Sequence, residues 1–161
     1  MSNYLIPLMV VVPMLCAILV NAFAKFNKSI KVLTFVVAIC LPIIPLLSNY
    51  GLHFFGGYTP MLDNATGVIY HPAITYAFDM LQQIFIAAVG LITFLVAFIY
   101  LSKYKKASGQ YLFLLFMGTA SVTALMLTDD IFNMFVFFEI LALVQVGIVI
   151  ASPMDYSYEM A

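Results

Sequence analysis

The sequence predicts an all-α integral membrane protein with five transmembrane helices, and three observations carry that prediction. The 161 residues are 65% hydrophobic and 8% charged, whereas about a quarter of the residues in a soluble domain are charged. The mean hydropathy is +1.12. Five apolar runs each approach the roughly 20 residues that a helix needs to cross a bilayer. This composition excludes a soluble globular fold.

Each apolar run is expected to form one membrane-spanning helix of a single transmembrane unit over residues 1–161. Pro42 and Pro45 should bend the second helix, because each proline removes a backbone hydrogen bond. The first run could instead be a signal peptide, since Ala22-Phe23-Ala24 resembles a cleavage site. We expect it to be retained, because no positive charge precedes it and it is longer than a signal peptide's apolar region. The helices are expected at 4–24, 30–47, 80–101, 111–128 and 131–151.

The segment at 48–79 is predicted to be the one sizeable piece outside the membrane. A Gly-Gly pair followed by a proline indicates a turn in it. Phe54, Phe55, Ile69 and Tyr70 would suit a short hairpin lying on the membrane face. A loosely ordered loop with an aromatic belt is the alternative that the sequence leaves open.

The basic residues predict the orientation in the membrane. All six are lysines, and they gather in the two loops on one side, whereas the loops on the other side carry aspartates instead. The positive-inside rule therefore places the N-terminus outside and the C-terminus inside, as an odd number of spans requires. We expect the plasma membrane of a prokaryote rather than an organelle inner membrane. The lysines are Lys25, Lys28, Lys31, Lys103, Lys105 and Lys106, and the aspartates are Asp63, Asp79, Asp129 and Asp130.

One acidic side chain, Glu139, lies inside the fifth apolar run, whose outer boundary is marked by Asp129 and Asp130. A helical rise of about 1.5 Å per residue places Glu139 roughly 13 Å below Asp130, near the bilayer midplane. An ionisable group at that depth costs about 2.5–3.5 kcal/mol and serves ion or proton movement or grips a neighbouring helix. Asn133 and Gln145 each stand about 120° around the helix from Glu139 and are expected to serve packing.

A counter-charge for Glu139 is missing from the predicted spans. No lysine or arginine lies in the interior of any span, since Lys31 is only the second residue of the span at 30–47. A basic partner must therefore come from another polypeptide or from sequence beyond these residues. The alternative is a hydrogen bond across the tight turn between the fourth and fifth spans, which must lie antiparallel. Thr119, Ser121 and Thr123 are the possible donors at similar depth. In that interpretation Glu139 is a structural carboxylate that holds two helices together.

Other kinds of site are not expected. The chain has no basic patch for nucleic acid, no glycine-rich phosphate loop and no nucleophile–base pair. His53 and His71 lie in the 48–79 loop without another ligand at a metal-binding spacing. Phe132, Phe135 and Phe138 suit packing or lipid better than a cofactor. We therefore expect neither a bound cofactor nor a redox active site in this chain.

Three stretches resemble one known family. Residues 128–139, TDDIFNMFVFFE, resemble the fifth-helix signature of the antiporter-like subunits of respiratory complex I, multisubunit Na+/H+ antiporters and energy-converting membrane-bound hydrogenases. The GGYTP stretch at 56–60 is similar to the family's Gly-Gly-Trp-x-Pro, with tyrosine in place of tryptophan. The YLSKY stretch at 100–104 looks like the family's Tyr-Ser-x-x-Tyr ending of the third helix. The family's N-terminus is also on the outer face.

The resemblance implies a function and a larger protein. By it, Glu139 pairs with a lysine on a later helix, and this coupling drives transfer of H+ or Na+ by a non-catalytic subunit of a translocase complex. Family members have many more helices, so the chain would be an N-terminal fragment or one piece of a split subunit, unable to translocate ions alone. Its expected partners are other membrane subunits and the lipid bilayer. A structural or assembly subunit and a small oligomeric channel are the alternatives.

Overall fold

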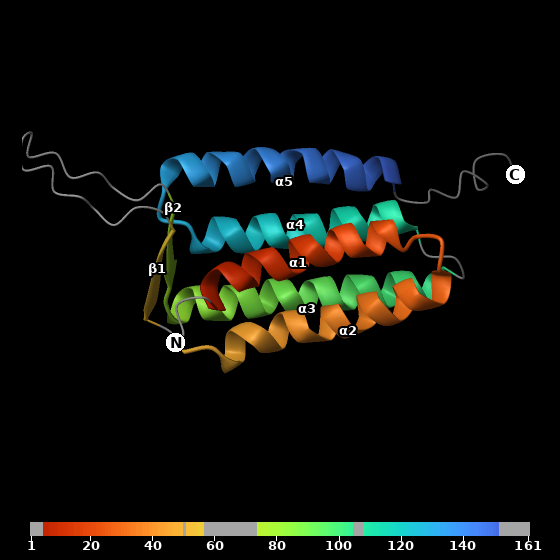
Figure 1. Cartoon of the computed structure of the whole chain (residues 1–161), viewed down its shortest axis with the longest axis horizontal. Helices are drawn as coiled ribbons and strands as arrows, with labels where there is room; N and C mark the ends of the chain where they lie inside the picture. Colours follow the sequence, from red (N-terminus) through yellow and green to blue (C-terminus); the bar gives the residue numbers. More distant parts are fainter. Residues whose placement is uncertain (1–4, 50, 57–73, 105–107, 152–161) are drawn as a thin grey trace, which may run out of the picture.

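The structure, a computed structural model, describes residues 5–49, 51–56, 74–104 and 108–151. Five helices lie side by side with their axes close to parallel, and a two-stranded sheet crosses one end of the bundle (Figure 1). Four of these helices are long and apolar enough to span a membrane, and α1 is a shorter apolar helix. The chain is a multi-pass helical membrane protein. The elements are α1 (Leu5–Ala22), α2 (Asn27–Leu47), β1 (Leu52–Gly56), β2 (Ile74–Phe78), α3 (Met80–Lys103), α4 (Gly109–Leu127) and α5 (Ile131–Ala151).

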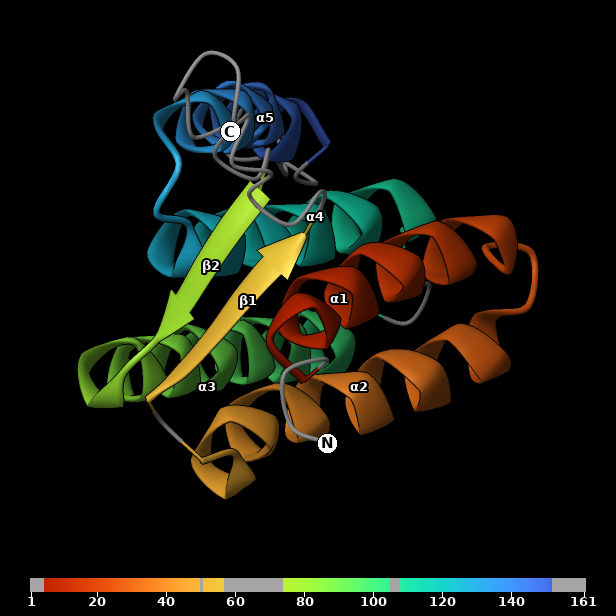
Figure 2. The same cartoon turned by 60° about the vertical axis from the view of Figure 1, so that its left-hand side comes forward.

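The helices form a bundle in which α2 and α5 occupy opposite edges (Figures 1 and 2). The closest pairs are α2 with α3, α1 with α4, and α4 with α5. We call the end that carries the two strands the hairpin end. The opposite end, where the α1–α2 connection carries Lys25 and α3 finishes at Lys103, is called the lysine end.

The helices begin and end within three residues of their predicted bounds, and local signals account for several of these ends. Before α3, the N–H of Asp79 donates to the side-chain oxygen of Gln82 at 3.1 Å, the reciprocal half of a capping box. Before α4, the Ser108 hydroxyl accepts from the N–H of Tyr111 at 3.4 Å. These contacts satisfy backbone N–H groups that a helix start leaves unpaired.

Two long-range side-chain contacts join the ends of α2 and α3, which run antiparallel. Gln83, at the start of α3, donates to the carbonyls of Pro45 and Ser48 at 2.9 and 3.0 Å. Lys31, near the start of α2, donates to the carbonyls of Leu101 and Tyr104 at 3.5 and 3.1 Å. Each helix thus supplies donors for carbonyl groups at the end of the other, where the intrahelical hydrogen bonds run out.

The middle of the α2–α3 pair is an unusually close backbone contact. A Cβ atom added to Gly90 would stand 2.7 Å from the nitrogen of Pro42 and 2.8 Å from the carbonyl carbon of Leu41. Any larger residue there would force the backbone of one helix to shift, because the neighbouring atoms are backbone rather than the flexible end of a side chain. The proline-containing segment of α2 therefore rests directly on α3.

The sheet differs in part from the predicted hairpin. The strand β1 contains Phe54 and Phe55, as expected, and pairs antiparallel with β2 in a register that sets Phe54 opposite Tyr76. The predicted partners Ile69 and Tyr70 lie outside the described residues, and the pairing strand begins further along the chain, at Ile74. It pairs there because Tyr76 and Phe78, only 8% and 0% exposed, can be buried against the ends of the helices.

Two apolar clusters form the interior, one towards each end. The cluster at the hairpin end joins β2 to α1, α3 and α4, and the cluster at the lysine end joins α1, α2, α3 and α4. No residue of α5 belongs to the fully buried part of either cluster within the described ranges. The four helices α1–α4 thus share a core, to which α5 is added at one side.

Candidate functional site

Glu139 is exposed on the outer side of α5. Its carboxylate forms no hydrogen bond or ion pair with any residue that the structure describes. Phe135, which lies one helical turn away on the same face, is 61% exposed, and Leu143, one turn further on, is 72% exposed. The carboxylate therefore lies within an apolar surface that nothing in the described part of the chain covers.

The orientation of Glu139 follows from the stripe by which α5 packs against α4. Only Asn133 and Val144 of α5 are buried. Val144 meets α4 at Gly118, whose added Cβ would stand 3.2 Å from it, and Gly147 lies against Leu114. These contacts fix one narrow seam, and Glu139 lies about 120° around the helix from Asn133, outside it.

The three hydroxyls named as possible partners of Glu139 are not bonded to it in the structure. Thr119 donates to the carbonyl of Leu115 at 2.9 Å and lies 2.8 Å from the hydroxyl of Thr93 on α3. Ser121 donates to the carbonyl of Met117 at 2.9 Å. Thr119, Ser121 and Thr123 are all buried, and none is bonded to α5. Side chains at equal depth on adjacent helices come together only when the faces that carry them are turned towards each other.

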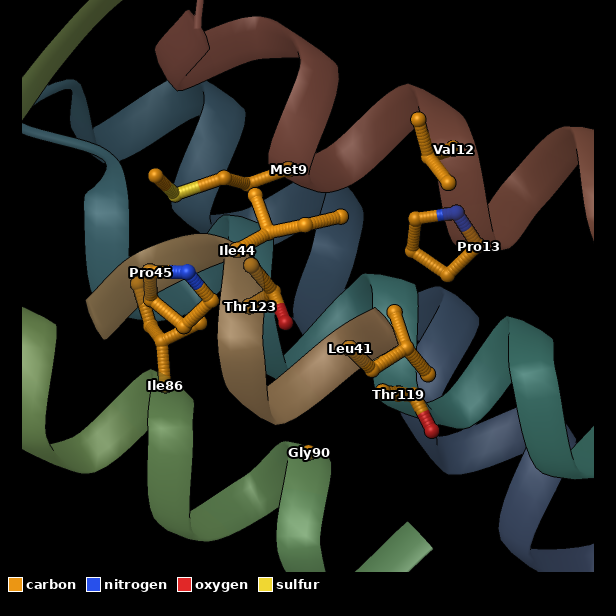
Figure 3. Close-up of a pocket in the computed structure, with 10 residues that line it drawn as sticks. All are labelled: Met9, Val12, Pro13, Leu41, Ile44, Pro45, Ile86, Gly90, Thr119 and Thr123. Carbon is orange, nitrogen blue, oxygen red and sulfur yellow. The ribbon is translucent and has the colours of Figure 1, made fainter. Parts of the chain in front are cut away.

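Thr119 and Thr123 line a small cavity inside the four-helix core (Figure 3). Its volume is about 10 Å³, which is room for about one water molecule. The wall includes Pro13 of α1 and Pro45 of α2, each of which lacks the N–H that would bond the carbonyl one turn earlier. A cavity of this size can hold a solvent molecule but cannot pass a hydrated ion.

A polar network ties the start of α5 to the hairpin. Asp130 accepts from the N–H groups of Phe132 and Asn133 at 3.3 and 3.2 Å and so caps the helix. The side-chain amide of Asn133 donates to the hydroxyl of Thr128 at 3.0 Å and to that of Tyr76 at 3.4 Å. Tyr76 also forms an isolated backbone bridge with Thr128.

This network shows where two residues singled out in the sequence, Asp130 and Asn133, lie. It also shows a role for Asn133 that the sequence did not reveal. Asp130 caps α5 at the hairpin end, and Asp129 beside it is exposed. Asn133 is 9% exposed, which agrees with its expected packing role, but its contact with Tyr76 joins residues 57 positions apart. The sequence signal was only the short spacing between Asp130 and Asn133, which is typical of a helix start.

An open groove runs along the junction of α3, α4 and α5. It has a volume of about 230 Å³ and is mostly apolar, with Thr93, Thr119 and Gln145 as its polar members. Gln145 is exposed on α5, about 120° from Glu139, so the groove and the carboxylate belong to different sides of that helix. The apolar lining comes from Val89, Ile92, Leu115, Val122, Leu141, Val144 and Ile148, with Gly118 between them.

The described residues offer one carboxylate within the apolar middle of the bundle, that of Glu139. They contain no group of three or more histidine, cysteine, aspartate or glutamate side chains that could hold a metal ion. The other described acids, Asp79, Asp129 and Asp130, lie at the hairpin end of the helices. Chemically, this arrangement can accept and release a proton, or hold a cation, at Glu139.

Comparison with known proteins gives the fold a wider context. No protein-family model matches the chain. An uncharacterized protein of Methanocaldococcus jannaschii is 36% identical over 157 residues, which are 98% of this chain and 31% of that protein. The chain thus spans about a third of the length of this relative.

A solved structure shares the fold. The match is to a chain in the structure of the membrane-bound sulfane sulfur reductase, an archaeal respiratory membrane complex, with a TM-score of 0.74 and 20% sequence identity. The aligned part covers 92% of this chain and 31% of the other. The bundle described above is therefore a membrane fold that occurs within a chain of a multisubunit respiratory complex.

Proposed function

We propose that this chain is part of the ion-translocating membrane arm of a respiratory-type complex, with Glu139 as the group that binds and releases the ion. One observation carries the proposal: a single carboxylate stands near the middle of a spanning helix, on an exposed apolar face, with no partner among the described residues. At that depth a lone carboxylate facing lipid would cost about 2.5–3.5 kcal/mol. A further helix that supplies a positive charge would remove that cost.

The comparisons support this proposal at the level of the fold. The structural neighbour belongs to an archaeal respiratory membrane complex, and its matching chain is about three times as long as the aligned part. The signature at 128–139 resembles that of antiporter-like subunits, in which the equivalent glutamate pairs with a lysine on a later helix. We propose the same pairing here, with the lysine on a later helix of a longer polypeptide or on another membrane subunit.

The proposal includes an orientation and a location. The lysine end would face the cytoplasm of a prokaryote and the hairpin end the outside, by the positive-inside rule. A protonatable or Na+-binding carboxylate would then lie midway between the two compartments. The ion is H+ or Na+, and both fit a carboxylate that gains and loses a basic partner.

A structural role is the second candidate. Glu139 could fasten α5 to a neighbouring subunit without taking part in transport. The narrow seam between α4 and α5 favours this role. A helix that packs on one side only would gain stability from a second contact with a neighbouring subunit. The two roles differ in what the complex loses when the charge is removed.

The test is a set of variants in the full-length subunit within its native complex. Glu139→Gln keeps the size of the side chain and removes the ionisable proton. We expect a complex of normal size on blue-native gels, with ion transport in membrane vesicles near background. Glu139→Asp, which keeps the carboxylate, should retain part of the transport. Asp129→Asn removes the same charge at the exposed α4–α5 turn and should transport normally.

The outcomes separate the two candidates. Normal transport by an assembled Glu139→Gln complex would rule out the relay role. Loss of the complex, with normal transport by whatever assembles, would favour the structural role. Running the assay with a pH gradient and with a Na+ gradient distinguishes the two ions.

A second measurement locates the partner of Glu139. The intact mass of the polypeptide extracted from its membrane would be close to 17.9 kDa if the lysine lies on another chain. A mass two to three times larger would place the lysine on a later helix of the same polypeptide.

A further inference from the structure

The side of the bundle opposite α5 contains a groove between α2 and α3. Its volume is about 320 Å³ and it opens outward. Its walls are apolar for most of their length, with Lys31 and Ser102 at one end. Figures 1 and 2 place this side away from α5, across α1 and α4. The apolar lining consists of Val32, Phe35, Val36, Phe98 and Leu101.

The α2 wall has a directional pattern. Lys28, Lys31, Val32, Phe35 and Val36 follow the spacing of one helical stripe, so they share a face. The two lysines occupy the turn nearest the lysine end, and the stripe positions that follow, Val32, Phe35 and Val36, are all apolar. The groove therefore has a cationic end, which we call its mouth, and continues from there as an apolar surface that runs parallel to the acyl chains of a membrane lipid.

Two aromatic rings, those of Phe35 and Phe98, line this groove, and Phe94 packs against both of them. The ring of Phe35 on α2 lies 6.0 Å from that of Phe94 and 6.5 Å from that of Phe98, and the latter two are 6.2 Å apart on α3. These separations are within the range of favourable aromatic contacts, so the rings hold one another in place. Phe35 and Phe98 remain 41% and 49% exposed on the outer side.

The charge at the mouth is held in position and lacks a described counter-ion. The Lys31 ammonium donates to two carbonyls at the end of α3, which leaves one of its three N–H bonds for another acceptor. Ser102 and Lys28 are exposed beside it. Lys103 lies at the same end, with its nitrogen 5.4 Å from the Tyr104 ring. Among the described residues, the aspartates all lie at the hairpin end.

We propose that this α2–α3 groove is a binding site for an anionic phospholipid. The phosphate accepts hydrogen bonds from Lys31 and Ser102, and one acyl chain lies along Phe35, Val36 and Phe98. Charge complementarity selects a lipid over a protein helix, because the positive charge is confined to the mouth at headgroup depth and the rest of the groove has no polar group. The proposal is independent of ion transport by Glu139.

The test measures lipid binding to the protein purified in detergent from its native membrane, with whatever partners it retains. After delipidation it is titrated with phosphatidylglycerol or with phosphatidylcholine of the same acyl chains, and native mass spectrometry counts the bound lipids. We expect at least one phosphatidylglycerol to be retained in preference to phosphatidylcholine. Lys31→Gln should weaken phosphatidylglycerol binding about fivefold, the effect of one lysine near an anionic headgroup.

Two further variants make the result specific to the groove. Lys25→Gln removes the same charge from the α1–α2 connection, outside the groove, and should leave binding unchanged. Val36→Trp fills the groove without touching Lys31, so it should weaken binding of both lipids. It also keeps the test valid if Lys31→Gln fails to fold.

The proposal is overturned by any of three results. The first is equal retention of the two lipids by the unmodified protein. The second is an equal loss from Lys25→Gln and Lys31→Gln, which would indicate a diffuse surface charge. The third is unchanged binding in Val36→Trp.

Discussion

The outer faces of α5 and of the α2–α3 pair expose the same kind of apolar surface and differ in where their charge lies. On α5 the charge is Glu139, near the middle of the span, among residues such as Phe135 and Leu143. On the α2–α3 face the charges are Lys28 and Lys31, at the lysine end, and the middle is apolar. Apolar exposure alone therefore does not say what covers a membrane-facing surface.

The depth of the charge makes the difference. A charge at headgroup depth is solvated by water and anionic lipid, whereas a carboxylate at the midplane requires a protein partner or water. The way in which each set of helices is packed into the bundle agrees with this difference in charge depth. The pair α2–α3 is closed by backbone contact at Gly90 and by contacts at both ends, whereas α5 rests on one seam. We infer that the outer face of α2–α3 is covered by lipid and that the outer face of α5 is covered by a further protein helix.

The largest expected effect comes from introducing a glutamate near the middle of the α2–α3 face. Leu91 lies near the middle of α3, 51% exposed and two turns from Phe98 on the same face. Leu91→Glu should destabilise the protein by about 2.5–3.5 kcal/mol, because the carboxylate would face lipid. The measurement is the free energy of unfolding in detergent–lipid mixtures, together with the yield of folded protein.

Leu91→Met is the control, since it keeps an apolar side chain of similar volume. A Leu91→Glu protein that accumulates and unfolds like the unmodified protein would mean that this face is covered by protein or reached by water. The distinction between the two faces would then fail.

A smaller effect is expected at the seams. Gly90→Ala introduces a Cβ less than 3 Å from α2 backbone atoms. We expect a loss of about 1–2 kcal/mol, because overpacking costs about 1–3 kcal/mol and alanine's helix propensity restores up to about 1 kcal/mol.

Gly147→Ala on the α4–α5 seam is the matched control. Its Cβ would lie 3.0 Å from the end of the flexible Leu114 side chain, which can shift. Its stability should be unchanged or up to about 1 kcal/mol higher than that of the unmodified protein, because alanine's helix propensity applies here too. Equal losses in the two variants would contradict the difference in attachment.

The smallest effect concerns the tether at the start of α5. Asn133→Ala removes the hydrogen bonds to Thr128 and Tyr76 and should cost about 1 kcal/mol. Backbone amides of β2 and of the first turn of α5 should then exchange faster with solvent, while those of α2 and α3 keep their protection. Gln145→Ala, an exposed polar residue of the same helix, should change neither. Unaltered exchange at β2 in Asn133→Ala would show that the network does not hold the hairpin.

The positions of the helices could be predicted from the sequence, but their rotations could not. Apolar length and the flanking polar residues place each helix end within three residues, because these properties are local. The rotation of α5 is different. Its residues are apolar on nearly every side, so no amphipathic pattern indicates which face meets α4. The sequence therefore left open whether Glu139 turns towards Thr119, Ser121 and Thr123, and in the structure it does not.

Contacts between distant residues were the other part that the sequence left open. Lys31 was used only to predict the orientation in the membrane, yet it reaches carbonyls at the end of α3, about 70 residues away. The β2 strand pairs with β1 across an insertion of 17 residues, 57–73, that the structure does not describe. Neither contact has a sequence spacing that reveals it. The 120° separation of Asn133 from Glu139, by contrast, follows from helical geometry and agrees with the structure.

The most direct measurement is site-specific photocrosslinking in native membranes, with benzoylphenylalanine in place of Phe135 or of Phe98. The account predicts that position 135, on the same face as Glu139, crosslinks to a further transmembrane segment, which peptide mass spectrometry would identify. It predicts that position 98 crosslinks to phospholipid. Lipid as the only product at position 135 would contradict the account, because Glu139 would then lie against the bilayer without a protein partner.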